Sequence, residues 1–193
     1  PVVKAAALIT AALTALAVAA VIYILNVGLS ARAEPGWAEQ LAARTVRNAA
    51  IARDARELTN PVPVSEEAIA EGRAHFADHC ATCHANDGSG NTQIGRNLFP
   101  RAPDMRQSQT QTLSDGELFW IIDKGVRFTG MPAWGNDTLA GEVSTWQLVH
   151  FIRRLPKLTP QEIEEMESLN PRPPGTAEPE SASPHDTSPG GHH

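Results

Sequence analysis

The sequence predicts an all-α protein with one N-terminal transmembrane helix. Several segments place apolar side chains at helical spacing, residues 5–29 carry no charged side chain, and neither a convincing strand nor an internal repeat is found. The 193 residues allow one ordinary domain with attachments, and 41% hydrophobic residues suffice for a packed core. The net charge of -6 is the opposite of the basic excess typical of nucleic-acid-binding proteins, so no nucleic-acid partner is expected. The two cysteines are too few for a disulfide-dense scaffold.

Residues 1–30 are predicted to form the transmembrane anchor, because the uncharged stretch is long enough to span a bilayer with some tilt. The alternative is a cleaved signal peptide, and Ala31-Arg32-Ala33 would offer a small-x-small cleavage site. The apolar region of a signal peptide is usually only about 7–15 residues long, so the length favours an uncleaved anchor. Lys4 precedes the span and Arg32 follows it, so charge alone barely decides the orientation.

Residues 31–64 are predicted to be an Arg-bearing stalk followed by a proline linker. The segment 36–58 reads as one helix, since alanine is frequent and no proline interrupts it. Trp37, Leu41, Ala49 and Ala52 could form a weak apolar stripe for docking a partner, but a solvated stalk is the favoured interpretation. Residues 60–63 (Asn-Pro-Val-Pro) break the helix and stiffen the linker.

Residues 65–170 are predicted to form the compact domain. Helices are expected from Ser65 to about His79, from Ser114 to about Gly125 and over 141–155, with a shorter acidic helix from Pro160 that lies outside the main core. Residues 84–112 are rich in Gly, Asn, Pro and Gln and read as loop. Residues 171–193 are dominated by Pro, Ser, Gly and His and are predicted to be a disordered tail.

The motif that carries chemistry is Cys80-Ala81-Thr82-Cys83-His84. Two thiols at this spacing suit covalent attachment to the two vinyl groups of a haem, and the next residue is then an iron-ligating histidine. A dithiol redox pair would be expected beside a βαβ pattern, which is missing. A zinc site would need a second cysteine pair, which the sequence also lacks. The motif therefore predicts one covalent haem c, held by Cys80 and Cys83.

With this motif, residues 65–158 resemble a monohaem class I cytochrome c. Gly72 and Phe76 stand where that family packs its N-terminal helix against its C-terminal helix, and the segment 146–152 (Trp-Gln-Leu-Val-His-Phe-Ile) resembles that C-terminal helix. The segment 130–134 (Gly-Met-Pro-Ala-Trp) resembles the one that delivers the sixth iron ligand. The resemblance implies a class I cytochrome c fold around one haem, with His84 and Met131 as the metal ligands.

Met131 is favoured over the other two methionines as the sixth ligand. It lies between a glycine and a proline on a predicted loop, whereas Met105 lies in a loop nearer the motif and Met166 in the acidic helix. The resemblance further implies that a proline carbonyl in the loop after the motif accepts a hydrogen bond from His84. Pro103 is the preferred residue for this role and Pro100 is the alternative.

Other polar residues are weaker candidates. Arg106, Arg127 and Trp134 could contact haem propionates, but ordinary surface or packing roles are as probable for each on sequence grounds. His75 and His79 share one helix at a spacing of four residues, which could bind a metal but is more often a solvated pair. His150 reads as interfacial, and His185, His192 and His193 lie in the tail.

Ligation by His84 and Met131 would leave no open iron position for a substrate, so the protein is expected to be an electron carrier and not an enzyme. The expected partners are redox proteins: membrane respiratory or photosynthetic complexes, or a periplasmic dehydrogenase. The expected location is the bacterial inner membrane, with a single span and the haem domain in the periplasm. The alternatives are a fixed haem subunit of a larger membrane oxidoreductase and, less favoured, a gas sensor or peroxidase with a labile Met131.

Overall fold

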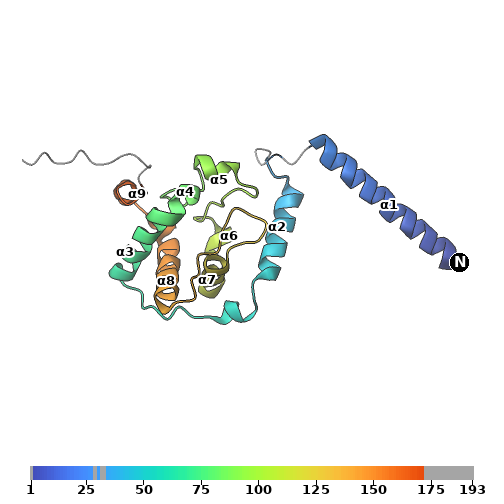
Figure 1. Ribbon diagram of the computed structural model, residues 1–193. Coiled ribbons are helices and arrows are strands. Elements are labelled where there is room, and N and C mark those ends of the chain that lie inside the picture. The colour runs from blue at the N-terminus through green and yellow to red at the C-terminus, as the bar shows by residue number, and fades with distance from the viewer. Residues whose placement is uncertain (1, 28–29, 31–33, 172–193) are drawn as a thin grey trace, which may run out of the picture.

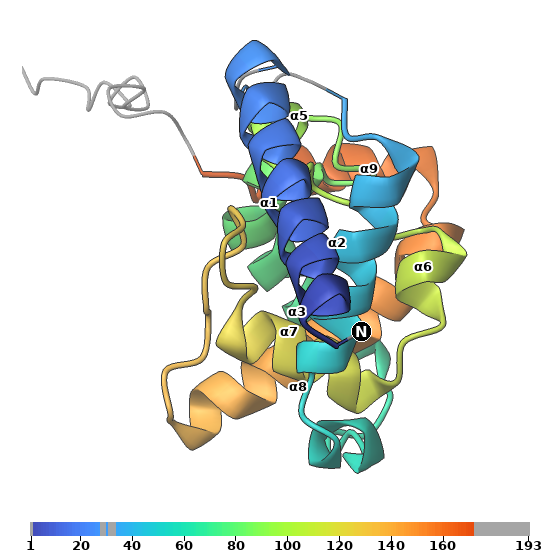
Figure 2. The same ribbon diagram turned by 90° about the vertical axis from the view of Figure 1, so that its right-hand side faces the viewer.

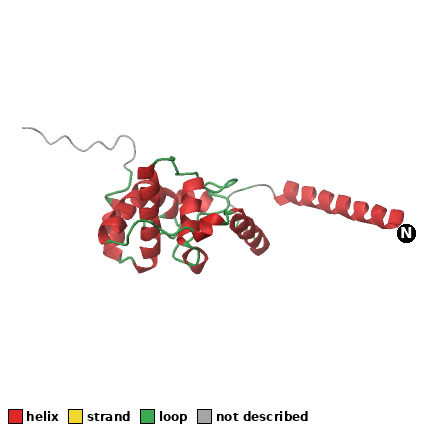
Figure 3. Cartoon of the chain, turned by 90° about the horizontal axis from the view of Figure 1, so that it is seen from below, coloured by secondary structure: helices red, strands yellow, loops and turns green. Residues whose placement is uncertain are grey.

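The computed structural model describes residues 2–27, 30 and 34–171 (Figure 1). Within these ranges the chain consists of helices and connecting loops, and no strand occurs in them (Figure 3). The prediction of an all-α protein is confirmed for this part of the chain. The predicted disorder of the tail concerns residues that lie almost entirely outside it.

Helix α1 (Val2–Val27) stands apart from the other helices. Its apolar core has a mean hydropathy of 2.5 and no part of it is buried by the rest of the chain. The two threonines and the asparagine of the helix bond to its own backbone, for example from Thr10 Oγ1 to the Ala6 carbonyl (3.0 Å) and from Asn26 Nδ2 to the Ile22 carbonyl (2.7 Å). Internal satisfaction of polar groups is what a bilayer requires, so α1 fits a single-pass membrane anchor.

Helix α2 (Trp37–Ala50) is shorter than the predicted helix over 36–58. The backbone becomes extended at Ile51, whose side chain is only 2% exposed, and a 3-10 turn, η1 (Asp54–Glu57), follows. Ala55 of η1 is buried against Gly116, where a Cβ would collide with the Ala55 carbonyl. The prediction of one continuous helix is wrong because this packing overrides local helix propensity.

The core of the compact domain is built on the contact between α3 (Glu66–His75) and α8 (Leu139–Arg154). Gly72 lets the helices approach closely, since a Cβ there would lie 2.2 Å from the Gln147 carbonyl oxygen. Beside it, the rings of Phe76 and Phe151 pack 5.1 Å apart, and both are fully buried. Helix α8 begins at Leu139, slightly before the predicted residue 141, because the Thr138 side chain caps it.

Helix α7 (Asp115–Lys124) packs on the other side of α8. Ser114 and Glu117 form a capping box at its start, and the ring of Phe119 stacks on Trp146 at 4.2 Å. Arg153 near the end of α8 bonds to the Asp115 carboxylate (2.7 Å) and to the Gln111 carbonyl (2.9 Å). These contacts fix the orientation of α7 relative to α8.

Helix α9 (Pro160–Glu167) closes the domain, and the expectation that Met166 lies outside the compact core is wrong. Met166 is 0% exposed and belongs to the main hydrophobic cluster. Just after α9, Asn170 Nδ2 donates to the Ala77 carbonyl (2.8 Å), which ties the C-terminal end of the described chain to the segment before the cysteine motif. The acidic composition of α9 gave no indication that the Met166 side chain is buried.

Candidate functional site

The cysteine motif follows directly from the core. A single π-helical turn, η2 (Phe76–Cys80), continues α3, and the short helix α4 (Ala81–His84) carries the rest of the motif. π-turns within helices frequently occur at functional sites. Because Phe76 and Ala77 are buried, the position of Cys80 is set by the core packing.

Both cysteines are free and half-buried. Burial, and to a smaller extent the neighbouring Cys83, raises the pKa of the Cys80 thiol to about 12, and burial also raises the pKa of Cys83. Reactive dithiol pairs have a lowered thiol pKa. The electrostatics therefore do not favour a thiol–disulfide redox pair.

The residue His84 is partly exposed, but its Nδ1 atom is buried, and the imidazole is uncharged at neutral pH. Burial lowers the pKa of its imidazole to about 4, and an interaction with the Pro103 carbonyl opposes this shift. The buried Nδ1 atom makes no hydrogen bond of regular geometry. A neutral imidazole has a lone pair available for a metal, so the protonation state suits ligation.

The loop after the motif wraps tightly around it. Gly90, at a φ of +71°, donates its N–H to the His84 carbonyl (2.8 Å), and a Cβ there would lie 2.4 Å from the Ala102 carbonyl oxygen. Thr92 caps the short helix α5 (Gln93–Asn97) and donates its hydroxyl to the Cys83 carbonyl (3.2 Å). These contacts bring Pro103 to His84. The supporting roles of Gly90 and Thr92 were missed from the sequence, although the glycine-rich stretch 88–90 indicated a tight turn there.

Two short helices lie in the segment 84–112, which was predicted to be only loop: α5 and α6 (Ser108–Gln111). Between them, Arg106 pairs with Asp104 (2.8 Å) and Asp87 (2.8 Å). The guanidinium is thus engaged by two carboxylates of its own loop. This arrangement supports a structural role for Arg106 more directly than contact with a propionate.

Met131 lies on the loop that follows α7. The loop folds back on itself, since Val126 N–H donates to the Met131 carbonyl (3.1 Å) and Met131 N–H donates to Thr129 Oγ1 (3.1 Å). A Cβ on Gly130 would lie 2.6 Å from Leu98, so this loop touches the end of the segment that wraps the motif. Met131 is half-buried, whereas Met105 and Met166 are packed in the core at 7% and 0% exposure.

The remaining candidates have ordinary surroundings. His79 packs edge-on against Trp134 (5.3 Å) and His75 (4.9 Å). His150 Nε2 lies 2.8 Å from the Val62 carbonyl and joins the proline linker to α8, as an interfacial residue would. Arg127 is exposed, and in the described ranges no group of three or more His, Cys, Asp or Glu side chains is arranged to hold a metal ion. The three tail histidines lie outside those ranges.

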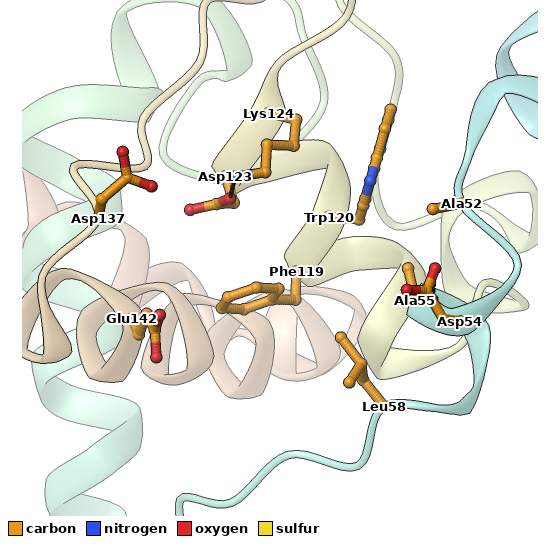
Figure 4. Close-up of a pocket in the computed structure, with 10 residues that line it drawn as sticks. All are labelled: Ala52, Asp54, Ala55, Leu58, Phe119, Trp120, Asp123, Lys124, Asp137 and Glu142. Atoms are coloured by element: carbon orange, nitrogen blue, oxygen red, sulfur yellow. Dashed lines mark hydrogen bonds and ion pairs between the residues drawn. The ribbon is translucent and has the colours of Figure 1, made fainter.

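A separate cleft of about 310 Å³ lies between η1 and α7 and contains none of the predicted ligands (Figure 4). Phe119 and Leu58 line its floor, and Asp123 pairs with Lys124 (2.7 Å) at its rim. Figure 4 shows Asp137 and Glu142 on the side of the cleft away from η1. The cleft is a feature of the helix packing and is distinct from the motif.

A helix ending in Cys-x-x-Cys-His and crossed closely by a C-terminal helix is the arrangement of a c-type cytochrome domain, a class that carries haem c. Comparison with known families agrees: residues 67–152 match the family model described as cytochrome C oxidase, cbb3-type, subunit III. This part of the chain is therefore a c-type cytochrome domain, and helix α1 fits its anchoring to a membrane. A search of curated proteins found no match to the chain.

Proposed function

We propose that this protein is a membrane-anchored electron carrier that holds one haem c, bonded through Cys80 and Cys83 and ligated by His84 and Met131. The observation that carries the proposal is the combination of two unpaired thiols with a neutral imidazole, whose Nδ1 atom is buried, in one short helical segment. A redox-active dithiol would need more acidic thiols, and a structural zinc site would need more ligands nearby.

The residues at the motif fit such a group. The buried Nδ1 of His84 has no regular hydrogen-bond partner, but the Pro103 carbonyl interacts with the same ring. A ligating histidine commonly donates its other ring N–H to a carbonyl, which fixes the ring and makes it a better ligand. Pro103, held by the Gly90 turn, is therefore the proposed acceptor, in preference to Pro100.

Met131 is the proposed second iron ligand because it is the only one of the chain's three methionines that the hydrophobic core does not use. The N–H and the carbonyl of Met131 both make hydrogen bonds within the loop, so the direction in which its side chain leaves the backbone is fixed. When bound, haem supplies a one-electron iron couple, and a soft thioether ligand raises its reduction potential. With His84 and Met131 both ligating, the chain leaves no position for a substrate.

The proposed partners are membrane respiratory or photosynthetic complexes, with α1 crossing the bacterial inner membrane once and the domain on the periplasmic side. The second candidate function is a fixed haem subunit within a larger membrane oxidoreductase. The match to an oxidase-subunit family favours this candidate specifically. Purification in mild detergent distinguishes the two, because a fixed subunit would elute with stoichiometric partner chains and a carrier would elute alone.

The covalent attachment is tested by extracting the denatured protein with acidified organic solvent and measuring its mass. We expect the haem to stay with the chain, since thioether bonds survive unfolding. Release of the haem would contradict attachment through Cys80 and Cys83.

The sixth ligand is tested by Met131→Ala, with Met105→Leu as the matched control. We expect Met131→Ala to abolish the sulfur-to-iron charge-transfer band of the oxidised form, to lower the reduction potential and to allow the reduced form to bind carbon monoxide. The control should do none of these. Ready binding of carbon monoxide by the unmutated protein would instead support the sensor or peroxidase alternative.

A further inference from the structure

Helix α2 turns its apolar side away from the protein. On a helical projection, one continuous side of the helix, called here the outer face of α2, holds seven residues without a formal charge and one amide: Trp37, Ala38, Leu41, Ala42, Thr45, Val46 and Ala49, with Asn48 between Trp37 and Leu41. The face contains no ionisable group. Trp37, Leu41 and Val46 are 80%, 58% and 68% exposed. A helix on the surface of a soluble domain normally turns such a face inward.

The opposite side of α2, which carries its arginines, faces the domain. Arg44 and Arg47 are the half-buried residues of the helix, and burial is the largest cause that lowers the pKa of Arg47. Arg56 then links the segment to α7 through an ion pair with Glu117 (3.1 Å) and also donates to the Asn48 carbonyl. With Ile51 buried next to them, these contacts fix the rotation of α2, so the outward direction of the apolar face is set by packing.

The position of α2 in the chain identifies what covers this face. Only residues 28–36 separate the end of α1 from Trp37. A chain of this length spans at most about 30 Å when fully extended, so α2 must start close to the surface from which α1 emerges. Figures 1 and 2 show α2 on the outside of the domain, on the same side as α1.

We propose that α2 lies on the bilayer surface with its outer face in the interfacial region of the lipid, and thereby holds the cytochrome domain in one orientation relative to the membrane. A lipid interface accepts an apolar helix face that presents a tryptophan and no charge, and it requires no specific partner side chains. A second copy of this chain or another protein would instead cover the face with side chains. The inference rests on the anchoring role of α1 and adds a second, surface-lying contact to it.

The test uses the full chain in phospholipid vesicles, with one nitroxide-labelled cysteine introduced at a time. Leu41→Cys reports on the outer face, and Gln40→Cys, one residue away on the polar side, is the matched control. The accessibility of each label to oxygen, which is concentrated in lipid, is compared with that to a polar nickel chelate. Retention of the haem absorption spectrum shows that each variant is folded, and the chain without an introduced cysteine gives the background.

We expect the label at position 41 to be at least about threefold more accessible to oxygen than to the chelate, relative to the label at position 40. Equal access of the chelate to both positions would overturn the proposal, because the outer face would then lie in water. Exclusion of both reagents from position 41 would also overturn it and would indicate a protein partner or a second copy. Failure of the chain to float with the vesicles would contradict the anchoring role of α1 itself. Labelling of the chain without an introduced cysteine would show that Cys80 or Cys83 is free, which would contradict the thioether bonds.

Discussion

At the scale of single residues, the contact between α3 and α8 depends on the absence of a side chain at Gly72. The Gln147 carbonyl occupies the space that a Cβ would need, and the atom in the way belongs to the backbone of a well-packed helix. Neither helix can move away without separating the Phe76 and Phe151 rings. This close approach sets the path of the chain into Cys80, so it links packing to the proposed haem site.

We expect Gly72→Ala to destabilise the domain by about 1–3 kcal/mol, the usual cost of overpacking a core. Thermal unfolding followed by circular dichroism would measure this as a fall in melting temperature. Gly36→Ala is the matched control, because a Cβ at position 36 meets nothing within 4 Å. A Gly72→Ala variant as stable as the control would contradict the close approach of α3 and α8.

Asp104 gives the loop after the motif a predictable pH dependence. Hydrogen bonding by Arg106 is the largest cause that lowers the pKa of this carboxyl to about 2, and Gln107 contributes as well. A carboxyl whose pKa is depressed on folding stabilises the native state above its ordinary pKa of 3.8, and this stabilisation is lost as the pH falls towards 2.

Asp104→Asn should therefore lower the free energy of unfolding at neutral pH by about 1 kcal/mol or less, since both side chains of the pair are partly exposed and water weakens their attraction. The difference from the unmutated protein should shrink between pH 3.8 and 2. Denaturant unfolding of both proteins at a series of pH values measures this difference in the free energy of unfolding. A difference that stays constant down to the lower end of that range would show that the negative charge is not responsible.

At the scale of elements, α7 is the helix from which the Met131 loop starts. Its N-terminus is fixed by the Ser114–Glu117 capping box, its side packs on α8 through Phe119, and its C-terminal end leads into the Met131 loop. Trp134 N–H bonds back to the Ile122 carbonyl (3.1 Å), so the loop is anchored on the same helix that starts it. The orientation of Met131 therefore depends on the stability of α7.

Replacing the cap of α7 should have a measurable cost. We expect Ser114→Ala to destabilise the domain by about 1 kcal/mol, because the Glu117 N–H loses its acceptor. Ser108→Ala is the control, since Ser108 is exposed and its side chain makes no hydrogen bond in the structure. Thermal unfolding measures the effect, and equal melting temperatures for the two variants would exclude a significant role for the cap.

At the scale of the whole molecule, the C-terminal end of the described chain is part of the domain. The side chain of Asn170 donates to the Ala77 carbonyl (2.8 Å) and exchanges hydrogen bonds with Asn86 (2.9 Å). It thereby joins the end of the chain to the π-turn before Cys80 and to the loop after His84. We therefore expect the domain to need the chain as far as Asn170.

Two truncations test that boundary. A chain that ends at Asn170 should keep the melting temperature and haem spectrum of the full chain, because the tail from Pro171 is predicted to be dispensable. A chain that ends at Leu169 loses the amide and should be less stable by about 1–3 kcal/mol, the usual cost of an unsatisfied buried polar group. Equal stability of the two truncated chains would show that Asn170 does not contribute, and a large loss in the first would show that the tail docks.

The sequence by itself determined the helical class, the apolar N-terminal helix and the cysteine motif. Each of these depends on local features: helical periodicity, an uncharged stretch, and the spacing of Cys80, Cys83 and His84 along one turn. The motif could therefore be identified from the sequence alone. Met131 and Pro103 could be named as candidate residues from the resemblance to a family.

Only the tertiary structure decided where α2 ends, which side of α2 faces the domain and which methionines lie in the hydrophobic core. The segment of good helix propensity breaks where Ile51 and Ala55 become buried, Ala55 against Gly116 of α7. The half-buried arginines of α2 turn its apolar face outward, and the burial of Met166 makes α9 part of the core. These outcomes depend on contacts between residues far apart in the chain, so they could not be predicted from the sequence. The free energy gained by burying such a side chain exceeds the helix preference of a single residue, which is roughly a few tenths of a kcal/mol.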